Sequence, residues 1–115
     1  MTFWDGSNWV WGDQGRPPAG LGSNPVTIYQ SDQDRVIVFV LDRLNRLWIN
    51  YFNGDSWVWE DRGLPPGTTA VAPPAAVYEA QRNRPIAFVK GADEHLWMNY
   101  FDGVAWSWED QGFPA

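Results

Sequence analysis

Apolar and polar side chains alternate with a period of two along the middle of the chain. Four short runs rich in β-branched and aromatic residues occupy 26–30, 35–41, 46–52 and 56–60, and turn-forming residues separate them. This alternation is typical of β-strands rather than helices. The Asn53-Gly54 pair between the last two runs favours a tight hairpin, because both residues tolerate positive φ. The pattern therefore predicts four short antiparallel strands.

The same pattern recurs along the chain. From Pro25 to Gly63, 17 of 39 positions are identical to the residue 49 positions later, which two unrelated segments would not show. An aromatic residue, Asp or Asn, Gly and then a Trp-x-Trp motif appear three times, within 3–15, 51–63 and 100–112. The chain therefore divides into a partial repeat at 1–20 and two full repeats at 21–67 and 68–115.

A four-stranded antiparallel unit that repeats at a fixed period of about 40–50 residues is typical of a β-propeller blade. The Pro- and Gly-rich passages at 16–22 and 64–69 can continue neither a helix nor a central strand, so we expect them to cross from one sheet to the next. The predicted fold is all-β, with blades of four antiparallel strands that repeat every 49 residues or so.

Two blades and a fragment cannot close a propeller ring within one chain. An open pair of blades would expose Trp-rich sheet faces of a size that soluble monomers avoid, so we expect a homo-oligomer that completes the ring. Three chains would supply six full blades, within the known range of four to eight, whereas two chains would supply four. A trimer is therefore favoured.

Composition narrows the function. Nine Trp, six Phe and four Tyr make up 17% of the 115 residues, and the net charge of −6 has the wrong sign for nucleic acid or an anionic membrane surface. There is no Cys for a disulfide or a thiolate metal site. The longest apolar run, Val36 to Leu41, is far shorter than a membrane-spanning helix, and the first residues show no secretory signal. We expect a soluble chain, whose localisation stays open.

The sequence gives little support for a catalytic site or a metal site. His95 is the single histidine, and its counterpart in the other repeat is Arg46, which favours a solvated turn residue. The pairs Glu60-Asp61 and Glu109-Asp110 could supply glycosidase carboxylates, but strand neighbours point to opposite faces and the pair recurs with the fold's period. We therefore expect no enzyme activity, no catalytic residues, no metal and no cofactor.

Aromatic side chains beside amides are the remaining candidates. A sugar presents apolar C–H faces and a rim of hydroxyls, so its site needs a flat ring and planar polar groups. Trp48 with Asn50, and Trp97 with Asn99, alternate at i and i+2 and share one face of the third strand. The fourth strand adds Trp57, Trp59, Trp106 and Trp108. Blade packing is the alternative role: it is the stronger one for the fourth-strand Trp residues and equally weighted for the Trp–Asn pairs.

These motifs resemble the blades of a lectin family typified by the lectin of the insect-pathogenic bacterium Photorhabdus luminescens. The resemblance rests on residues 47–54 with 57–63 and on residues 96–103 with 106–114, and it covers nearly the whole chain. It implies seven-bladed propellers that bind fucose and related, sometimes O-methylated, sugars between neighbouring blades. A second family of fucose-binding propellers has two-blade chains that trimerise, but its sugar-binding Glu would fall on Ile49 and Met98, so that site does not carry over.

Two functions follow from these observations. The first is a non-enzymatic lectin whose partners are fucosylated or methylated glycans, bound in shallow pockets and with multivalency supplied by oligomerisation. The second is a protein-interaction propeller, or a fragment or designed scaffold, without sugar affinity.

Overall fold

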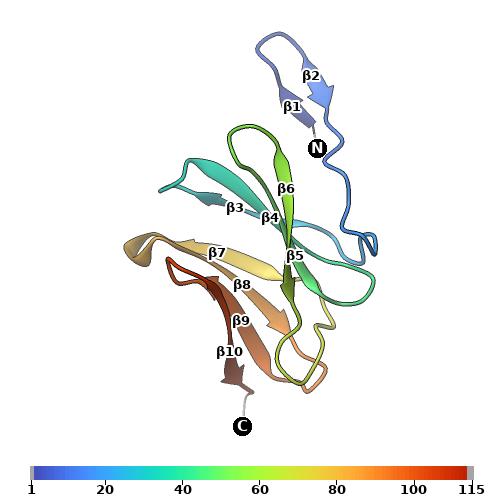
Figure 1. The fold of residues 1–115 in the computed structure, drawn as a ribbon, viewed down its shortest axis with the longest axis vertical. Coiled ribbons are helices and arrows are strands. Elements are labelled where there is room, and N and C mark those ends of the chain that lie inside the picture. Colours follow the sequence, from blue (N-terminus) through green and yellow to red (C-terminus); the bar gives the residue numbers. More distant parts are fainter. Residues whose placement is uncertain (1, 114–115) are drawn as a thin grey trace.

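The computed structural model describes residues 2–113 and contains ten β-strands in three antiparallel groups (Figure 1). The N-terminal hairpin joins β1 (Thr2–Trp4) and β2 (Trp9–Trp11). The first sheet has the order β3 (Val26–Gln30), β4 (Arg35–Leu41), β5 (Leu47–Phe52) and β6 (Trp57–Gly63). The second sheet has the same order in β7 (Ala75–Glu79), β8 (Arg84–Lys90), β9 (Leu96–Phe101) and β10 (Trp106–Gly112). A 3₁₀ turn, η1 (Ala80–Arg82), links β7 to β8.

The all-β prediction is confirmed, and the two four-stranded antiparallel sheets have the form expected of propeller blades. Strand β6 differs from the predicted run at 56–60, since it continues to Gly63. The pairing partners Trp48 with Asp61 and Leu47 with Gly63 leave Arg62 as one extra residue, which is a β-bulge. The Asp61 carboxylate accepts the Gly63 N–H at 2.7 Å and holds this bulge in place.

The turn between the last two strands of each repeat is four residues long. Phe52 pairs with Trp57, so Asn53 to Ser56 form the loop. The Asn53 side chain accepts the backbone N–H of Asp55 and of Ser56, and Gly54 has a φ of +105°. The Asn-Gly pair therefore sits at the start of a wider turn, where Asn supplies the acceptor and Gly supplies the positive φ.

The core lies between the two sheets, which pack face to face (Figure 1). One face of the first sheet contributes Ile37, Phe39 and Ile49, and the facing side of the second sheet contributes Val89 and Trp97. The first strands of the two sheets, β3 and β7, lie next to each other. Neighbouring sheets in a propeller stack in this way, although residues 2–113 form no closed ring.

A repeated hydrogen bond fixes each unit to the one before it. The Trp108 indole N–H donates to the Arg62 carbonyl oxygen at 2.9 Å, which joins the second sheet to the first. The Trp59 indole donates to the Gln14 carbonyl oxygen at 2.8 Å. Gln14 and Arg62 hold equivalent positions in successive repeats. Residues 12–15 therefore contact the first sheet in the same way as the end of β6 contacts the second sheet.

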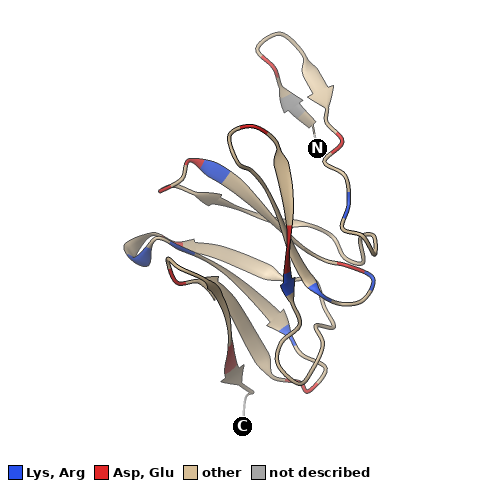
Figure 2. Cartoon of the chain, viewed as in Figure 1, with Lys and Arg blue, Asp and Glu red and all other residues tan. Residues whose placement is uncertain are grey.

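Charged residues are scattered over the elements, and the acidic ones lie mostly in turns and near strand ends (Figure 2). Within residues 2–113, the structure contains no helix long and apolar enough to span a bilayer. The same described residues form no cluster of three or more His, Asp or Glu side chains that could hold a metal ion.

Candidate functional site

A cavity of about 520 Å³ opens between the two sheets, and we call it the inter-sheet cleft. The first sheet provides a polar wall made of Gln30, Arg35, Tyr51, Glu60 and Arg62. The second sheet provides an aromatic wall, in which Phe101 and Trp106 lie beside Pro85. Polar groups on one side and flat rings on the other therefore face a single space.

The polar wall is an ordered network of side chains. Arg35 Nε donates to Gln30 Oε1 at 2.7 Å, and the Arg35 guanidinium lies 4.2 Å from the centre of the Tyr51 ring. The Tyr51 hydroxyl donates to Glu60, whose other oxygen accepts from Arg62 at 3.1 Å. Burial, together with the neighbouring Glu60 carboxylate, raises the pKa of the Tyr51 hydroxyl. Tyr51 therefore remains a neutral donor near pH 7.

The aromatic wall is held by ring contacts. The Trp106 ring lies 5.7 Å from Phe101 and meets Phe39 of the first sheet edge-on at 6.2 Å. The Arg62 guanidinium approaches the Trp106 ring to 5.4 Å. Trp106 is only partly buried, so part of its surface borders the inter-sheet cleft.

The structure buries both predicted Trp–Asn pairs. Trp48 and Asn50 are 8% and 2% exposed, and Trp97 and Asn99 are 7% and 1% exposed. Each Asn side chain donates to a carbonyl of the neighbouring strand, Asn50 to Val58 at 3.0 Å and Asn99 to Ser107 at 3.2 Å. These bonds support the strand pairing, so the packing role is the one that the burial favours.

The two repeats satisfy their buried indole N–H groups in different ways. Trp48 donates at 2.8 Å to Asp42, which is fully buried and also accepts the backbone N–H groups of Leu44 and Arg46. Burial opposes the charge on Asp42, but these donors outweigh it and lower the pKa of the carboxyl.

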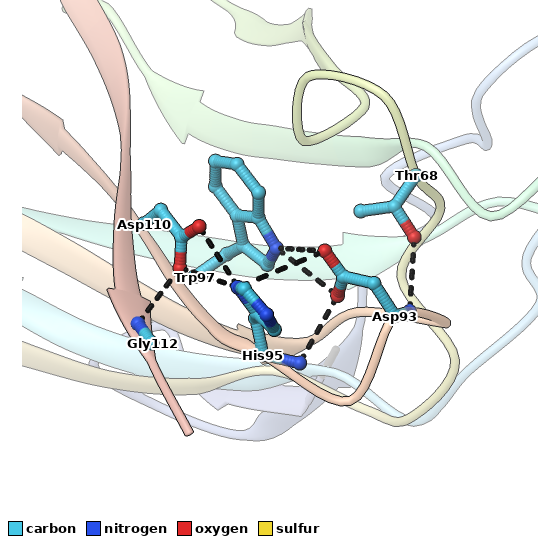
Figure 3. Close-up of polar contacts among 6 residues, drawn as sticks. All are labelled: Thr68, Asp93, His95, Trp97, Asp110 and Gly112. Carbon is cyan, nitrogen blue, oxygen red and sulfur yellow. Dashed lines mark hydrogen bonds and ion pairs between the residues drawn. The ribbon is translucent and has the colours of Figure 1, made fainter.

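In the second sheet the carboxylate has moved two residues along the turn (Figure 3). Gly91 stands at the position of Asp42, and Trp97 donates instead to Asp93, at 3.3 Å to each oxygen. A Cβ atom at Gly91 would lie 2.3 Å from Asp93 Oδ1, so the glycine leaves room for this carboxylate. The exchange of Asp-x-Leu for Gly-x-Asp preserves the acceptor for the indole.

His95 lies in the same turn and contacts Asp110 at 2.8 Å (Figure 3). The hydrogen bond to Asp110 raises the pKa of the His95 imidazole. Two hydrogen bonds lower the pKa of the Asp110 carboxyl. The larger contribution comes from the backbone N–H of Gly112, and the next comes from the His95 side chain. In the first sheet, the residue equivalent to His95 is Arg46, whose side chain is permanently charged. Arg46 pairs with Asp61 at 3.3 Å. His95 therefore ties the turn to the last strand.

The Trp residues of the fourth strands lie in three different places. Trp57 and Trp59, with Asn50, line a second cavity of about 520 Å³ between the first sheet and residues 12–15. Its other walls are largely valine, including Val36 and Val38, so it offers few partners to sugar hydroxyls. Trp108 packs against the core, and Trp106 borders the inter-sheet cleft. Trp57 also lines a cavity of about 500 Å³ with Gln33 and Asp34. Trp106 is the predicted site residue that borders the inter-sheet cleft.

The sequence does not predict the residues of the polar wall. Arg35, Tyr51 and Glu60 come from three different strands, so no local motif joins them. The available signal was the repeat, because all three are identical at the equivalent positions of the second repeat.

Comparison with known proteins found no family model that matches the chain and no relative among the curated proteins.

Proposed function

We propose that this chain is a non-enzymatic lectin that binds a sugar in the inter-sheet cleft. The observation that carries this proposal is the pairing of the Trp106 and Phe101 rings with the polar wall of Arg35, Tyr51 and Glu60 across one cavity. A ring can stack on the apolar face of a sugar while the opposite wall bonds its hydroxyls.

The polar wall offers both kinds of hydrogen-bond partner that a sugar rim requires. The guanidinium groups of Arg35 and Arg62 are donors, and the Glu60 carboxylate is an acceptor. These side chains already brace one another, so little rotamer freedom is lost when a ligand arrives. A shallow site of this kind is expected to bind a monosaccharide with a Kd on the order of 0.1–10 mM.

Binding without hydrolysis is the expected outcome. A glycosidase needs two carboxyl groups on either side of the scissile bond, at a separation of roughly 5–10 Å. Among the described residues that line the cleft, Glu60 alone carries a carboxylate. Its neighbour Asp61 bonds Gly63 and pairs with Arg46 on the other face of the strand.

Fucose-like or O-methylated sugars are the proposed ligand class, and this choice rests on the resemblance of the repeats to propeller lectins. Multivalency supplied by a homo-oligomer, with the trimer favoured, completes the proposal, because several weak sites on one rigid assembly raise avidity for clustered glycans by roughly 10² or more. Light scattering should then give about 39 kDa, three times 13.1 kDa.

A protein-interaction role is the second candidate, favoured by the exposed indoles of Trp4, Trp9 and Trp11 in the N-terminal hairpin. A glycan array separates the two functions. Failure to bind any fucosylated or O-methylated glycan at millimolar concentration would leave the interaction role standing.

Calorimetry with L-fucose tests the proposed site. Arg35→Ala removes a charged donor from the polar wall and should weaken binding by about tenfold or more. Arg43→Ala is the matched control, because Arg43 is exposed in the turn at the other end of β4. EDTA should leave the affinity unchanged. If wild type and Arg35→Ala bound the same number of L-fucose molecules per chain with equal affinity, the inter-sheet cleft would not be the site.

A further inference from the structure

The second sheet carries half of another cleft on its outer face, which we define as the face of β7–β10 turned away from the first sheet. The residues equivalent to the polar wall are Glu79, Arg84, Tyr100, Glu109 and Gln111. Glu79, Arg84 and Tyr100 keep the arrangement of their counterparts, since Arg84 Nε pairs with Glu79 and the Arg84 guanidinium lies 4.8 Å from the Tyr100 ring centre. Glu109 and Gln111 are exposed on the last strand. The outer face therefore carries the charged and aromatic core of a polar wall, and none of the described residues forms an aromatic wall opposite it.

The outer face keeps Ile86 and Met98 buried at its centre, at 4% and 8% exposure, but it is exposed at other positions where its counterpart is packed. Val77 is 48% exposed, whereas the equivalent Ile28 of the first sheet is 9% exposed. Leu96 is 45% exposed, whereas Leu47 is fully buried. The difference arises because the second sheet covers the first, while none of the described residues forms a sheet over the second.

The N-terminal hairpin carries the missing wall. Trp4 and Trp9 are the counterparts of Phe101 and Trp106, and their rings lie 5.9 Å apart, close to the 5.7 Å of the second pair. In the hairpin, however, these rings face solvent, with Trp9 at 70% exposure. The hairpin with these rings lies at one end of the molecule, and the second sheet lies at the other (Figure 1). The aromatic half of a cleft and the polar half are therefore far apart within one chain.

Trp11 indicates how the hairpin would be positioned on the outer face. Its counterparts Trp59 and Trp108 each donate to the carbonyl of the residue before the last glycine of the preceding unit. Trp11 is 81% exposed. On the outer face of the second sheet, the carbonyl equivalent to those of Gln14 and Arg62 belongs to Gln111.

We propose that the N-terminal hairpin of a second copy of this chain lies on the outer face of the second sheet, with the Trp11 indole donating to the Gln111 carbonyl. Trp4 and Trp9 of that copy then stand opposite Arg84 and Tyr100, and the two copies together form a second sugar cleft. The contact is head to tail, so each copy uses a different surface. The ligand of this shared cleft rests on the proposed function, whereas the contact between copies does not.

Complementation between two damaged full-length chains tests this contact. The hairpin variant carries Trp9→Ala with Trp11→Ala, and the face variant carries Glu109→Arg at an exposed position. Leu44→Ala is the control, because it removes an exposed apolar side chain from a turn outside both surfaces. Circular dichroism melts check that every variant is folded.

Light scattering should show wild type and Leu44→Ala above 13.1 kDa, and each damaged variant alone at 13.1 kDa. An equal mixture of the two variants retains one intact hairpin and one intact face, so it should form capped dimers of about 26 kDa, twice 13.1 kDa. A wild type of 13.1 kDa, or a mixture that remains at 13.1 kDa, would overturn the contact.

Calorimetry on the same samples separates this contact from the proposed function. Wild type should bind two L-fucose molecules per chain, each variant one, and the mixture three for every two chains. Masses that follow the expectation without any L-fucose binding would retain the contact and refute the lectin. One L-fucose per chain in every sample would retain the lectin and refute the shared cleft.

Discussion

The two sheets have the same strand order and pairing, yet they hold their buried Trp with carboxylates from different positions. In the first sheet, fully buried Asp42 receives the Trp48 indole and two backbone N–H groups. In the second, the partly exposed Asp93 receives the Trp97 indole over longer distances. The comparison teaches that the repeat preserves the need for an acceptor and not the residue that supplies it.

Removal of the two carboxylates should have the largest and most unequal effect. Asp42→Ala leaves the Trp48 indole and the Arg46 guanidinium without a buried partner, and we expect a loss of about 3–5 kcal/mol in the free energy of unfolding. Asp93→Ala should cost about 1 kcal/mol, because the contacts of Asp93 are longer and water can replace them. Urea unfolding of both variants measures the difference, and equal losses would contradict this comparison.

The arrangement of the first sheet should be transferable to the second. Gly91→Asp alone places a Cβ 2.3 Å from Asp93 Oδ1 and sets two carboxylates side by side, so it should destabilise the fold. Adding Asp93→Leu removes that carboxylate and recreates the Asp-x-Leu pattern, and it should recover most of the loss. A double variant less stable than the Gly91→Asp variant would show that the two turns are not equivalent.

The inter-unit hydrogen bonds offer an intermediate effect. Trp108→Phe removes the donor to the Arg62 carbonyl within the sheet interface and should cost about 1–2 kcal/mol. Trp59→Phe removes the equivalent bond to Gln14, but there it releases only the segment at 12–15. We expect a small change in global stability and faster hydrogen exchange of that segment. Protection that is equal in wild type and Trp59→Phe would argue against this anchor.

The smallest effect concerns His95 and depends on pH. Because the pKa of His95 is raised in the folded state, its pairing with Asp110 stabilises the fold fully below the unfolded pKa of about 6.5 and is lost as pH rises through the folded pKa. His95→Arg imitates Arg46 and keeps its charge. Its melting temperature should match that of wild type near pH 5 and exceed it near pH 8. A constant difference at both pH values would refute this explanation.

The positions and order of the strands could be predicted from the sequence. The alternation of apolar and polar residues marks each strand, and the 49-residue repeat shows that the same set of strands occurs twice. The bulge at Arg62 could not be predicted, since it is defined by the pairing of β6 with β5, and the Asp61–Gly63 bond only holds it in place. The Trp–Asn pairs have the side-chain chemistry of a sugar site, but the structure buries them and Asp42 and Asp93 accept their indole N–H groups. Periodicity cannot show which face of a blade a neighbouring blade covers.

The polar wall could not be predicted from the sequence for a related reason. Arg35, Tyr51 and Glu60 meet only after three strands align, and their partner Trp106 comes from the other repeat. Repeat identity could have indicated these residues, but identical positions include core residues as well.

NMR of the Trp indole N–H groups during titration with L-fucose tests the central claim most directly. The nine indole signals can be assigned with single Trp→Phe variants. We expect the Trp106 signal to shift on titration, while those of Trp48 and Trp97, which are bonded to buried or turn carboxylates, stay in place. Shifts confined to Trp57 and Trp59, or no shift at tens of millimolar L-fucose, would contradict sugar binding in the inter-sheet cleft.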